Sequence, residues 1–406
     1  MLFFFGLKCE AQQLGWLHGY RYRKKITIDK SKVEHTGTPV NHWKDFYVLV
    51  ELEDPALRHL EDAFENKITH PEGLDIAFST AIASVAPLKF QLVSYNAQTG
   101  KLVCWVLLDE LYTKNSTVDK NNSLYFFYGS AVLHQPHDPI VKSMWDKVYH
   151  HVEHFNETAQ GKIGAGKSFN GVSDQKLIKP HTNLDYTLSA WIKLSQSGQE
   201  QMIMSNDSAG VGGYQLKVDK ENKLVFTFKR FASVRTFIGS SVLKTNEWNY
   251  VNISLNSSRF IFLRNGSTEY SKIESGFSVV VPAQVVVGAS KTGDQYFNGI
   301  IDDLKISKIA KPTALLITEY VNQMDPKSFY SVEAEEVNLQ LAPYAYTFLG
   351  TINSVYLSQT NWYDGVYPGN NKNIIINAGL PAAISTNVVI NKLKLEPGAQ
   401  IHLTGQ

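Results

Sequence analysis

Short runs of alternating hydrophobic and polar residues make up most of this chain, with turn-forming residues between them. Period-two alternation in β-branched and aromatic runs, spaced by about ten residues, is typical of antiparallel β-sandwiches. One series of runs lies at 24–28, 46–52, 102–108 and 124–128, and a second at 186–194, 214–218, 223–228, 248–255, 259–263, 284–288 and 301–306. Long helical periodicity is absent, and short helices are expected near 55–65 and 313–322. We therefore predict an all-β protein with two antiparallel β-sandwich domains.

A third pattern begins near residue 338, where short strand-like runs recur at close and even spacing. Such spacing, interrupted by Pro397 and Gly398, is typical of the start of a parallel β-solenoid. Because solenoid coils bury their faces against neighbouring coils, we expect the ladder to continue beyond residue 406. The predicted units are 1–13, 16–135, 145–312 and 340–406, with a linker rich in Pro and His at 133–139.

The charge balance changes the range of possible functions. The chain has 39 Lys and Arg against 38 Asp and Glu, so its net charge of +1 argues against a nucleic-acid binder, which needs a basic surface. The same balance argues against a polybasic membrane-surface protein. No apolar run approaches the roughly 18 residues that span a bilayer, so no transmembrane segment is expected.

The N-terminus predicts export. Residues 1–13 look like the remnant of a secretory signal peptide, with a short apolar stretch and small residues near Cys9 and Ala11. A positively charged start is missing, which suggests a late start codon or a fragment. The alternative is an ordinary buried strand. Two cysteines exclude a disulfide scaffold and a cysteine zinc site, and Cys104 is interpreted as a small buried hydrophobe.

Two motif matches do not fit their surroundings. Residues 161–168 match the G-x-x-x-x-G-K-[ST] phosphate-binding loop, but no buried strand precedes them and no helix follows. We interpret them as a glycine-rich turn and predict no nucleotide site. Residues 150–154 match H-x-x-E-H, a zinc-protease pattern that needs a helix, yet their alternation fits a strand equally well. A surface histidine cluster is the simpler interpretation.

Residues 16–135 resemble the DUF2341 domain of exported bacterial proteins. The matching order and spacing cover the whole domain, in the segments 20–28, 46–50, 73–78, 88–95, 100–106 and 124–129. The resemblance implies a small β-sandwich and no established chemistry.

Residues 145–312 resemble a LamG-like domain of the concanavalin A-like jelly-roll class. The matching segments are 169–171, 186–191, 213–216, 248–251, 262–266, 287–288 and 297–306, although the loop between Phe155 and Gly161 is shorter than in that family. The resemblance implies binding of glycans or proteins, sometimes with calcium. Residues 345–406 are similar to solenoid-start segments in surface proteins of Bacteroidetes-type bacteria.

Asp302 is the strongest metal candidate. It shares strand parity with Leu304 and Ile306, and a carboxylate on a core-facing side is costly unless it is bonded or binds a cation. The LamG-like resemblance places a structural Ca²⁺ or a hydrogen bond near such a residue. The candidate calcium ligands are Asp302, Asn170 and the carbonyl of Gly171, since hard oxygen ligands suit Ca²⁺. The alternative is a carboxylate bonded to backbone amides.

Glycan binding needs exposed aromatic rings and fixed polar groups. Trp191 and Trp248 lie in strand patterns and are predicted core residues. The candidate ligand-binding residues lie in predicted loops, and simple surface filling is the alternative for each: Phe231, Phe237, Tyr296, Asn206, Asp207 and Asp294. No pair of carboxylates and no nucleophile motif can be assigned, so we predict no enzyme.

The sequence thus predicts an exported bacterial cell-surface or secreted protein that recognises a glycan or a protein through the LamG-like domain, as an adhesin or accessory module. A carbohydrate-binding module of a larger polysaccharide-degrading enzyme is the first alternative. A structural spacer is the second.

Overall fold

The computed structural model describes residues 16–35, 41–61, 66–80, 87–118, 122–130, 138–155, 157, 159–179, 185–207, 212–230, 233–273, 284–338, 345–348, 372–376, 381–384 and 390–403. Strands account for 56% of these residues, which confirms the all-β class. The predicted signal remnant at 1–13 lies outside the described residues.

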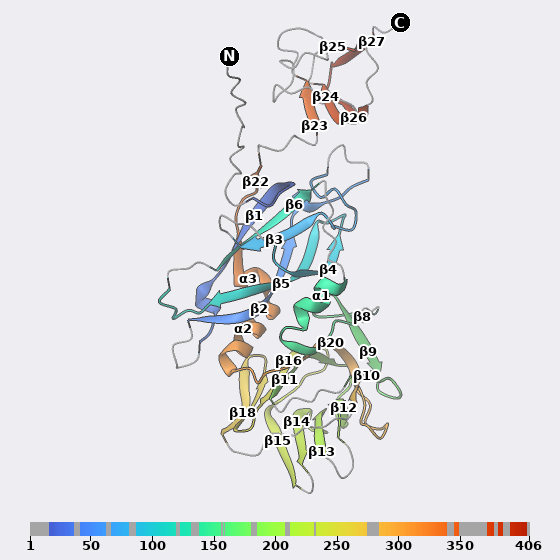
Figure 1. Cartoon of the computed structure of the whole chain (residues 1–406). Helices are drawn as coiled ribbons and strands as arrows, with labels where there is room; N and C mark the ends of the chain where they lie inside the picture. The colour runs from blue at the N-terminus through green and yellow to red at the C-terminus, as the bar shows by residue number, and fades with distance from the viewer. Residues whose placement is uncertain are drawn as a thin grey trace.

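The first sandwich consists of two antiparallel sheets (Figure 1). One has the order β21-β1-β6-β3, with β22 also paired to β1, and the other has the order β2-β5-β4. Their strands are β1 (Tyr20–Ile28), β2 (His42–Glu53), β3 (Ile76–Thr80), β4 (Phe90–Asn96), β5 (Lys101–Tyr112), β6 (Ser123–Ser130), β21 (Tyr330–Val332) and β22 (Glu336–Val337). The core between the sheets includes Ile26, Val48 and Phe126, and Cys104 is fully buried there, as predicted. Two 3₁₀ turns, at Lys30–Lys32 and Pro55–Leu57, connect these strands.

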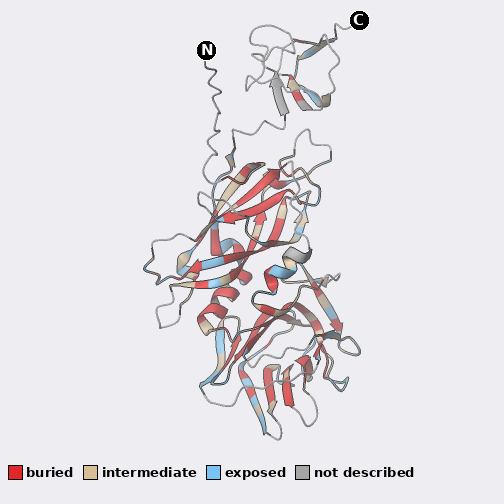
Figure 2. Ribbon diagram, in the orientation of Figure 1, coloured by how far each residue is buried: buried red, intermediate tan, exposed pale blue. Residues whose placement is uncertain are grey.

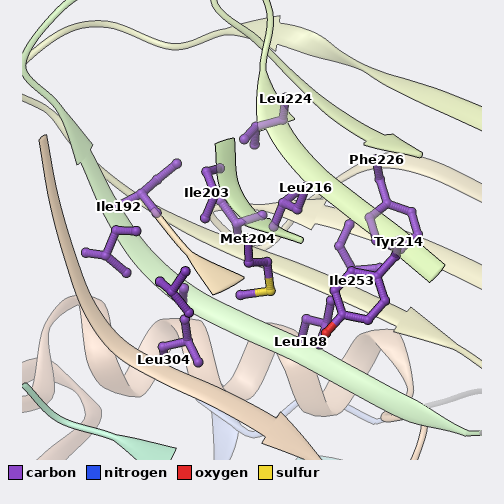
Figure 3. Packing of buried hydrophobic residues seen from close by; sticks show 14 of the residues in the cluster. Leu188, Ile192, Ile203, Met204, Tyr214, Leu216, Leu224, Phe226, Ile253 and Leu304 are labelled. Atoms are coloured by element: carbon purple, nitrogen blue, oxygen red, sulfur yellow. The ribbon is translucent and has the colours of Figure 1, made fainter. Parts of the chain in front are cut away.

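The second sandwich is a jelly roll of an eight-stranded and a six-stranded sheet. The eight-stranded sheet contains β7 (Tyr149–Glu153), β8 (Ala159–Gln160), β9 (Ala165–Asn170), β11 (Tyr186–Leu194), β16 (Trp248–Leu255), β17 (Arg259–Arg264), β18 (Ser267–Ile273) and β20 (Asn298–Ser307). The six-stranded sheet contains β10 (Lys176–Ile178), β12 (Gln201–Ser205), β13 (Gly212–Val218), β14 (Lys223–Arg230), β15 (Ser233–Val242) and β19 (Val285–Val287). Apolar side chains from both sheets interdigitate between them, with Met204, Tyr214 and Leu304 among them (Figure 3). Strands of both sheets carry buried residues along their length (Figure 2).

The chain returns to the first sandwich after the jelly roll. Helices α2 (Thr313–Met324) and α3 (Pro326–Phe329) lead into β21 and β22, which extend the first sheet beside β1. Residues 313–337, which lie outside the predicted units, therefore complete the first sandwich. The jelly roll is an insertion between two parts of one domain, and α1 (Asp138–Trp145) connects β6 to it.

The returning segment closes the free edge of β2. The amide of Asn322 accepts a hydrogen bond from the Leu49 N–H at 2.7 Å and donates to the Leu49 carbonyl at 3.1 Å. The Tyr330 hydroxyl does the same for Glu51, at 2.7 Å and 2.8 Å. Two side chains thus replace the strand partner that an edge strand lacks.

An apolar interface joins the two sandwiches. Outward-facing residues of β2 and β5, including Tyr47 and Trp105, pack with Trp145, Trp191 and Tyr250 from α1 and the eight-stranded sheet. The Trp191 indole N–H donates to Gln323 of α2 at 2.8 Å. Trp191 is buried, as predicted, but in this interface rather than in the jelly-roll core. The outer face of the eight-stranded sheet is therefore covered.

The C-terminal residues that the structure describes form parallel pairs. The strands are β23 (Ala345–Phe348), β24 (Lys372–Ile376), β25 (Pro381–Ile384), β26 (Ile390–Leu395) and β27 (Gln400–Leu403). β24 pairs with β23 and β26, and β25 pairs with β27. Parallel pairing is compatible with a solenoid, which stays a prediction. Among the described helices, none has the length and apolarity to cross a membrane.

Candidate functional site

The six-stranded sheet presents polar side chains on its outer face because β13 alternates strictly. Tyr214, Leu216 and Val218 point into the jelly-roll core, so Gln215 and Lys217 point outward and are half-buried. The described α-helices, α1, α2 and α3, lie on the opposite side of the jelly roll, toward the first sandwich (Figure 1). The outer face of the six-stranded sheet is therefore the candidate ligand-binding surface of the domain.

Two ion pairs fix the side chains on this face. The Lys217 ammonium lies 3.0 Å from Glu200, whose other oxygen accepts from the Gln295 amide at 3.0 Å. At the other end of β12, Asp207 accepts from Lys229 at 2.8 Å and from the Gln215 amide at 3.1 Å. The face thus holds fixed donors and acceptors, the groups that recognise sugar hydroxyls.

Asn206 and Asp207 follow β12 directly, and they play different parts. Asn206 is buried, and its side-chain oxygen accepts from the Tyr214 N–H at 2.9 Å, which fixes the loop. Asp207 is part of the outer-face network. Asp207, and not the Asn206 side chain, therefore belongs to the polar network on the outer face.

Asp294 and Tyr296 lie in the loop between β19 and β20. Asp294 is exposed, and hydrogen bonds from the Ser290 and Thr292 hydroxyls hold the pKa of its carboxyl below the usual value. Tyr296 is half-buried. The neighbouring Gln295 contacts Glu200 at the start of β12, so this loop and Asp207 stand at opposite ends of that strand.

Phe237 differs from its expectation as an exposed loop aromatic. It lies within β15 and is 8% exposed, with its ring centroid 4.2 Å from that of Phe260 and 4.9 Å from that of Tyr270. The reason is that the strand continues to Val242, beyond the loop expected from sequence. Phe231 lies outside the described residues.

Asp302 is fully buried, but it does not face the jelly-roll core. Asp303 has a positive φ of 48° and forms a bulge in β20. The bulge interrupts the alternation of side chains between the two faces, so Ile301 and Leu304 both face the core. The Asp302 side chain therefore points into the interface between the sandwiches. Its oxygens accept from the backbone N–H groups of Ile163 at 2.8 Å and Asp303 at 2.7 Å.

Asn170 and Asp302 are not brought together. The register pairs Asn170 with Asn298, four residues along β20 from Asp302. The Asn170 side-chain oxygen accepts from the N–H groups of Val172, Ser173 and Asp174, at 2.9 to 3.1 Å, which forms a local turn. A calcium ion shared by Asn170 and Asp302 therefore finds no common position in this register, and calcium at either residue stays a prediction.

We expect Asp302 to make the protein less stable at higher pH. Burial, and next the nearby charge of Asp303, raise its pKa from 3.8 to about 7. A raised carboxyl pKa contributes stability that is fully present below 3.8 and is lost as pH rises through about 7. Denaturant unfolding across this range should show the decline in the wild type and a smaller decline in Asp302→Asn. Equal pH profiles would contradict the assignment.

The two rejected motifs are explained by the fold. Residues 161–168 form the turn and strand after β8, and a Cβ at Gly161 would lie 2.4 Å from an Asp302 oxygen. A Cβ at Gly164 would lie 2.7 Å from Val93 of the first sandwich. Gly161 therefore allows close packing within the jelly roll, and Gly164 allows close packing against the first sandwich. Residues 150–154 lie on and after β7, a strand, and no group of three metal-ligating side chains occurs among the described residues.

A groove of about 780 Å³ lies between the sandwiches. The β2-β5-β4 sheet forms one wall, and the loop around 157–165 with the α2–α3 junction forms the other. Lys162 projects into it, and burial lowers the pKa of its ammonium. Neither Lys162 nor the pair Gln215 and Lys217 was a candidate from the sequence. The alternation in β13 was sufficient to predict that this pair points outward.

Comparison with known proteins identifies the jelly roll. Residues 169–314 match the family described as the concanavalin A-like lectin/glucanases superfamily. No curated protein matches the chain.

Solved structures share parts of the fold at low similarity. Domain 4 of AbnA, an extracellular arabinanase from Geobacillus stearothermophilus, in complex with arabinotriose, is 17% identical, with 42% of this chain and 86% of that chain covered and a TM-score of 0.34. The Ruminococcus gnavus IT-sialidase CBM40 bound to α2,3-sialyllactose is 12% identical, with 38% and 97% covered and a TM-score of 0.33. The SAP-like pentraxin from Limulus polyphemus is 16% identical, with 37% and 78% covered and a TM-score of 0.31.

The family match and the two facing antiparallel sheets agree on the same part of the chain. Residues 169–314 therefore form a concanavalin A-like lectin/glucanase domain.

Proposed function

We propose that this protein is a non-catalytic carbohydrate-binding module whose ligand lies on the outer face of the six-stranded sheet. One observation supports the proposal most directly. The first sandwich covers one sheet face of the lectin-like domain, while the other face carries polar side chains that are held by hydrogen bonds and ion pairs. Gln215, Lys217 and Asp207 would contact the sugar hydroxyls. Export and a place at the bacterial cell surface, which rest on residues 1–13, belong to the same proposal.

The double variant Gln215→Ala/Lys217→Ala tests this site. Because each hydrogen bond to a charged group contributes about 1.5–3 kcal/mol, we expect at least a tenfold loss of affinity. A glycan array would identify the ligand, and calorimetry would measure the loss. Lys244→Ala is the control, since that side chain is 76% exposed and lies in a loop outside the sheet. No glycan binding by the wild type, or an equal loss in the control, would contradict the proposal.

A structural calcium ion is a separate proposal for the same domain, taken from its LamG-like character, with Asp302 or Asn170 as alternative ligands because the two residues do not lie together. Thermal unfolding with EDTA and then with millimolar Ca²⁺ tests it. A specific ion would stabilise the protein by about 2.7 kcal/mol at a hundredfold excess over Kd. A transition that does not move would remove calcium and leave Asp302 as a carboxyl held by backbone amides.

A further inference from the structure

The groove between the two sandwiches contains several charged side chains, and most of them are paired with one another. The Lys101 ammonium lies 3.2 Å from Glu51. The Lys327 ammonium lies 3.5 Å from Glu51 and 3.2 Å from Glu53. These lysines are therefore neutralised within the wall that β2 forms, and they add little net charge to the groove.

Lys162 is the exception within the described part of the chain. Its ammonium has no carboxylate within 4.0 Å, donates to the Met324 carbonyl at 3.0 Å, and lies 5.2 Å from the centroid of the Trp191 ring. The Met324 carbonyl belongs to the last turn of α2, where the helix dipole offers partial negative charge. Together with the more distant carboxylates of Glu51 and Asp325, the carbonyl and the ring face compensate the half-buried ammonium only in part, so burial lowers its pKa.

A half-buried cation with no carboxylate in direct contact favours an anionic ligand. The charge is already partly desolvated in the free protein, so a carboxylate that reaches it pays less of the usual desolvation cost. Contacts of this kind are charge-assisted hydrogen bonds, which are about twice as strong as neutral ones. Binding of a negatively charged group is therefore most favourable at Lys162.

The remaining lining favours a saccharide over a peptide. Exposed hydroxyl and amide side chains of Ser94, Asn96 and Gln160 line the groove, and they suit sugar hydroxyls. Among the described lining residues, Met324 is the one exposed large apolar side chain, so anchors for peptide side chains are scarce. The volume of about 780 Å³ is within the usual range for a ligand pocket.

We propose that the groove is a second binding site, separate from the sheet face, for an oligosaccharide that carries uronic acid, with a carboxylate paired to Lys162. The two sandwiches form the site together, because Ser94 and Asn96 come from β4 of the first and Gln160 and Lys162 from the jelly roll. Neither sandwich alone contains it.

Calorimetry with trigalacturonate, trimannuronate and a hyaluronate tetrasaccharide tests the site, with the methyl ester of each as the uncharged control. At least one acid should bind at least tenfold more tightly than its ester, and its affinity should fall with added salt. Lys162→Met should lose at least tenfold, and Lys162→Arg should retain most of the affinity because the charge remains. Thermal unfolding of each variant separates loss of binding from loss of folding.

Glu51→Gln gives a test in the opposite direction. Removing this carboxylate frees Lys101 and leaves Lys327 paired with Glu53 alone, so binding of the acid should strengthen severalfold. The sheet-face variant Gln215→Ala/Lys217→Ala should leave uronate binding unchanged, which separates the two sites. Three outcomes would each overturn the proposal: no binding of any acid, equal binding of acid and ester, or tighter binding of hexaglutamate, which would indicate an acidic peptide.

Discussion

Asn322→Ala is expected to lower the free energy of unfolding by about 3 kcal/mol, because it leaves two buried backbone groups without partners. The Asn322 side chain is fully buried and bonds both the N–H and the carbonyl of Leu49 in the edge strand β2. No strand lies on that side of β2 in its sheet. Water cannot easily replace the amide there, because α2 packs against the strand.

Urea unfolding at neutral pH measures this loss. Met324→Ala is the matched control, since it changes an exposed residue of the same helix and should alter stability by less than about 0.5 kcal/mol. Asn322→Asp should also destabilise the protein, because a carboxylate cannot donate to the Leu49 carbonyl. A loss below about 1 kcal/mol in Asn322→Ala would show that the N–H and the carbonyl of Leu49 find other hydrogen-bond partners.

A chain that ends at residue 312 is expected to lose the stability of the first sandwich as well as of the interface. Without residues 313–338, β1 loses the partners β21 and β22, and the core loses Leu315, Phe329 and Tyr330. Full burial of one such side chain contributes about 1.5–3 kcal/mol, so the combined loss approaches the whole stability of a typical domain. The jelly roll would also lose the contact between Trp191 and Gln323.

Calorimetry of residues 16–312 and 16–338 checks this result. The longer chain should unfold in one cooperative transition, because the interface joins the two sandwiches. The shorter chain should lack that transition or melt at least 10 °C lower, since about 1 kcal/mol shifts the midpoint by 2–4 °C in domains of 150–250 residues. Equal midpoints would show that the returning segment is dispensable and that each sandwich is complete without it.

Local patterns predicted the strands well because burial on one face of a sheet imposes period two on the sequence. The segment 186–194 is an example, since it forms β11 as predicted. The same pattern failed at Asp302, where a single bulge at Asp303 shifts the parity of the rest of β20. A bulge is set by contacts between strands that are distant in sequence, so alternation within β20 does not reveal it.

The candidate sites divide in the same way. Asp207 was predicted as a ligand-binding residue and lies on the polar face, where its role stays a prediction, whereas Phe237 was predicted as a loop aromatic and is a packed strand residue. The ends of strands depend on neighbouring strands, so the sequence alone did not place Phe237 within β15. Lys162 lies inside the match that we interpret as a glycine-rich turn, and its position in a groove depends on the first sandwich, whose elements come both before and after it in the chain.

The sequence by itself determined the all-β class, the two sandwiches and the lectin-like character of the second, because each follows from local alternation and a family pattern. Only the tertiary structure decided that the jelly roll is inserted, that residues 313–337 complete the first sandwich, and which sheet face is covered. These features depend on contacts between β1 and β21, about 300 residues apart. A local sequence pattern cannot predict such a contact. The edge of β2 shows the same dependence, because its backbone groups are hydrogen-bonded by side chains from the end of the domain.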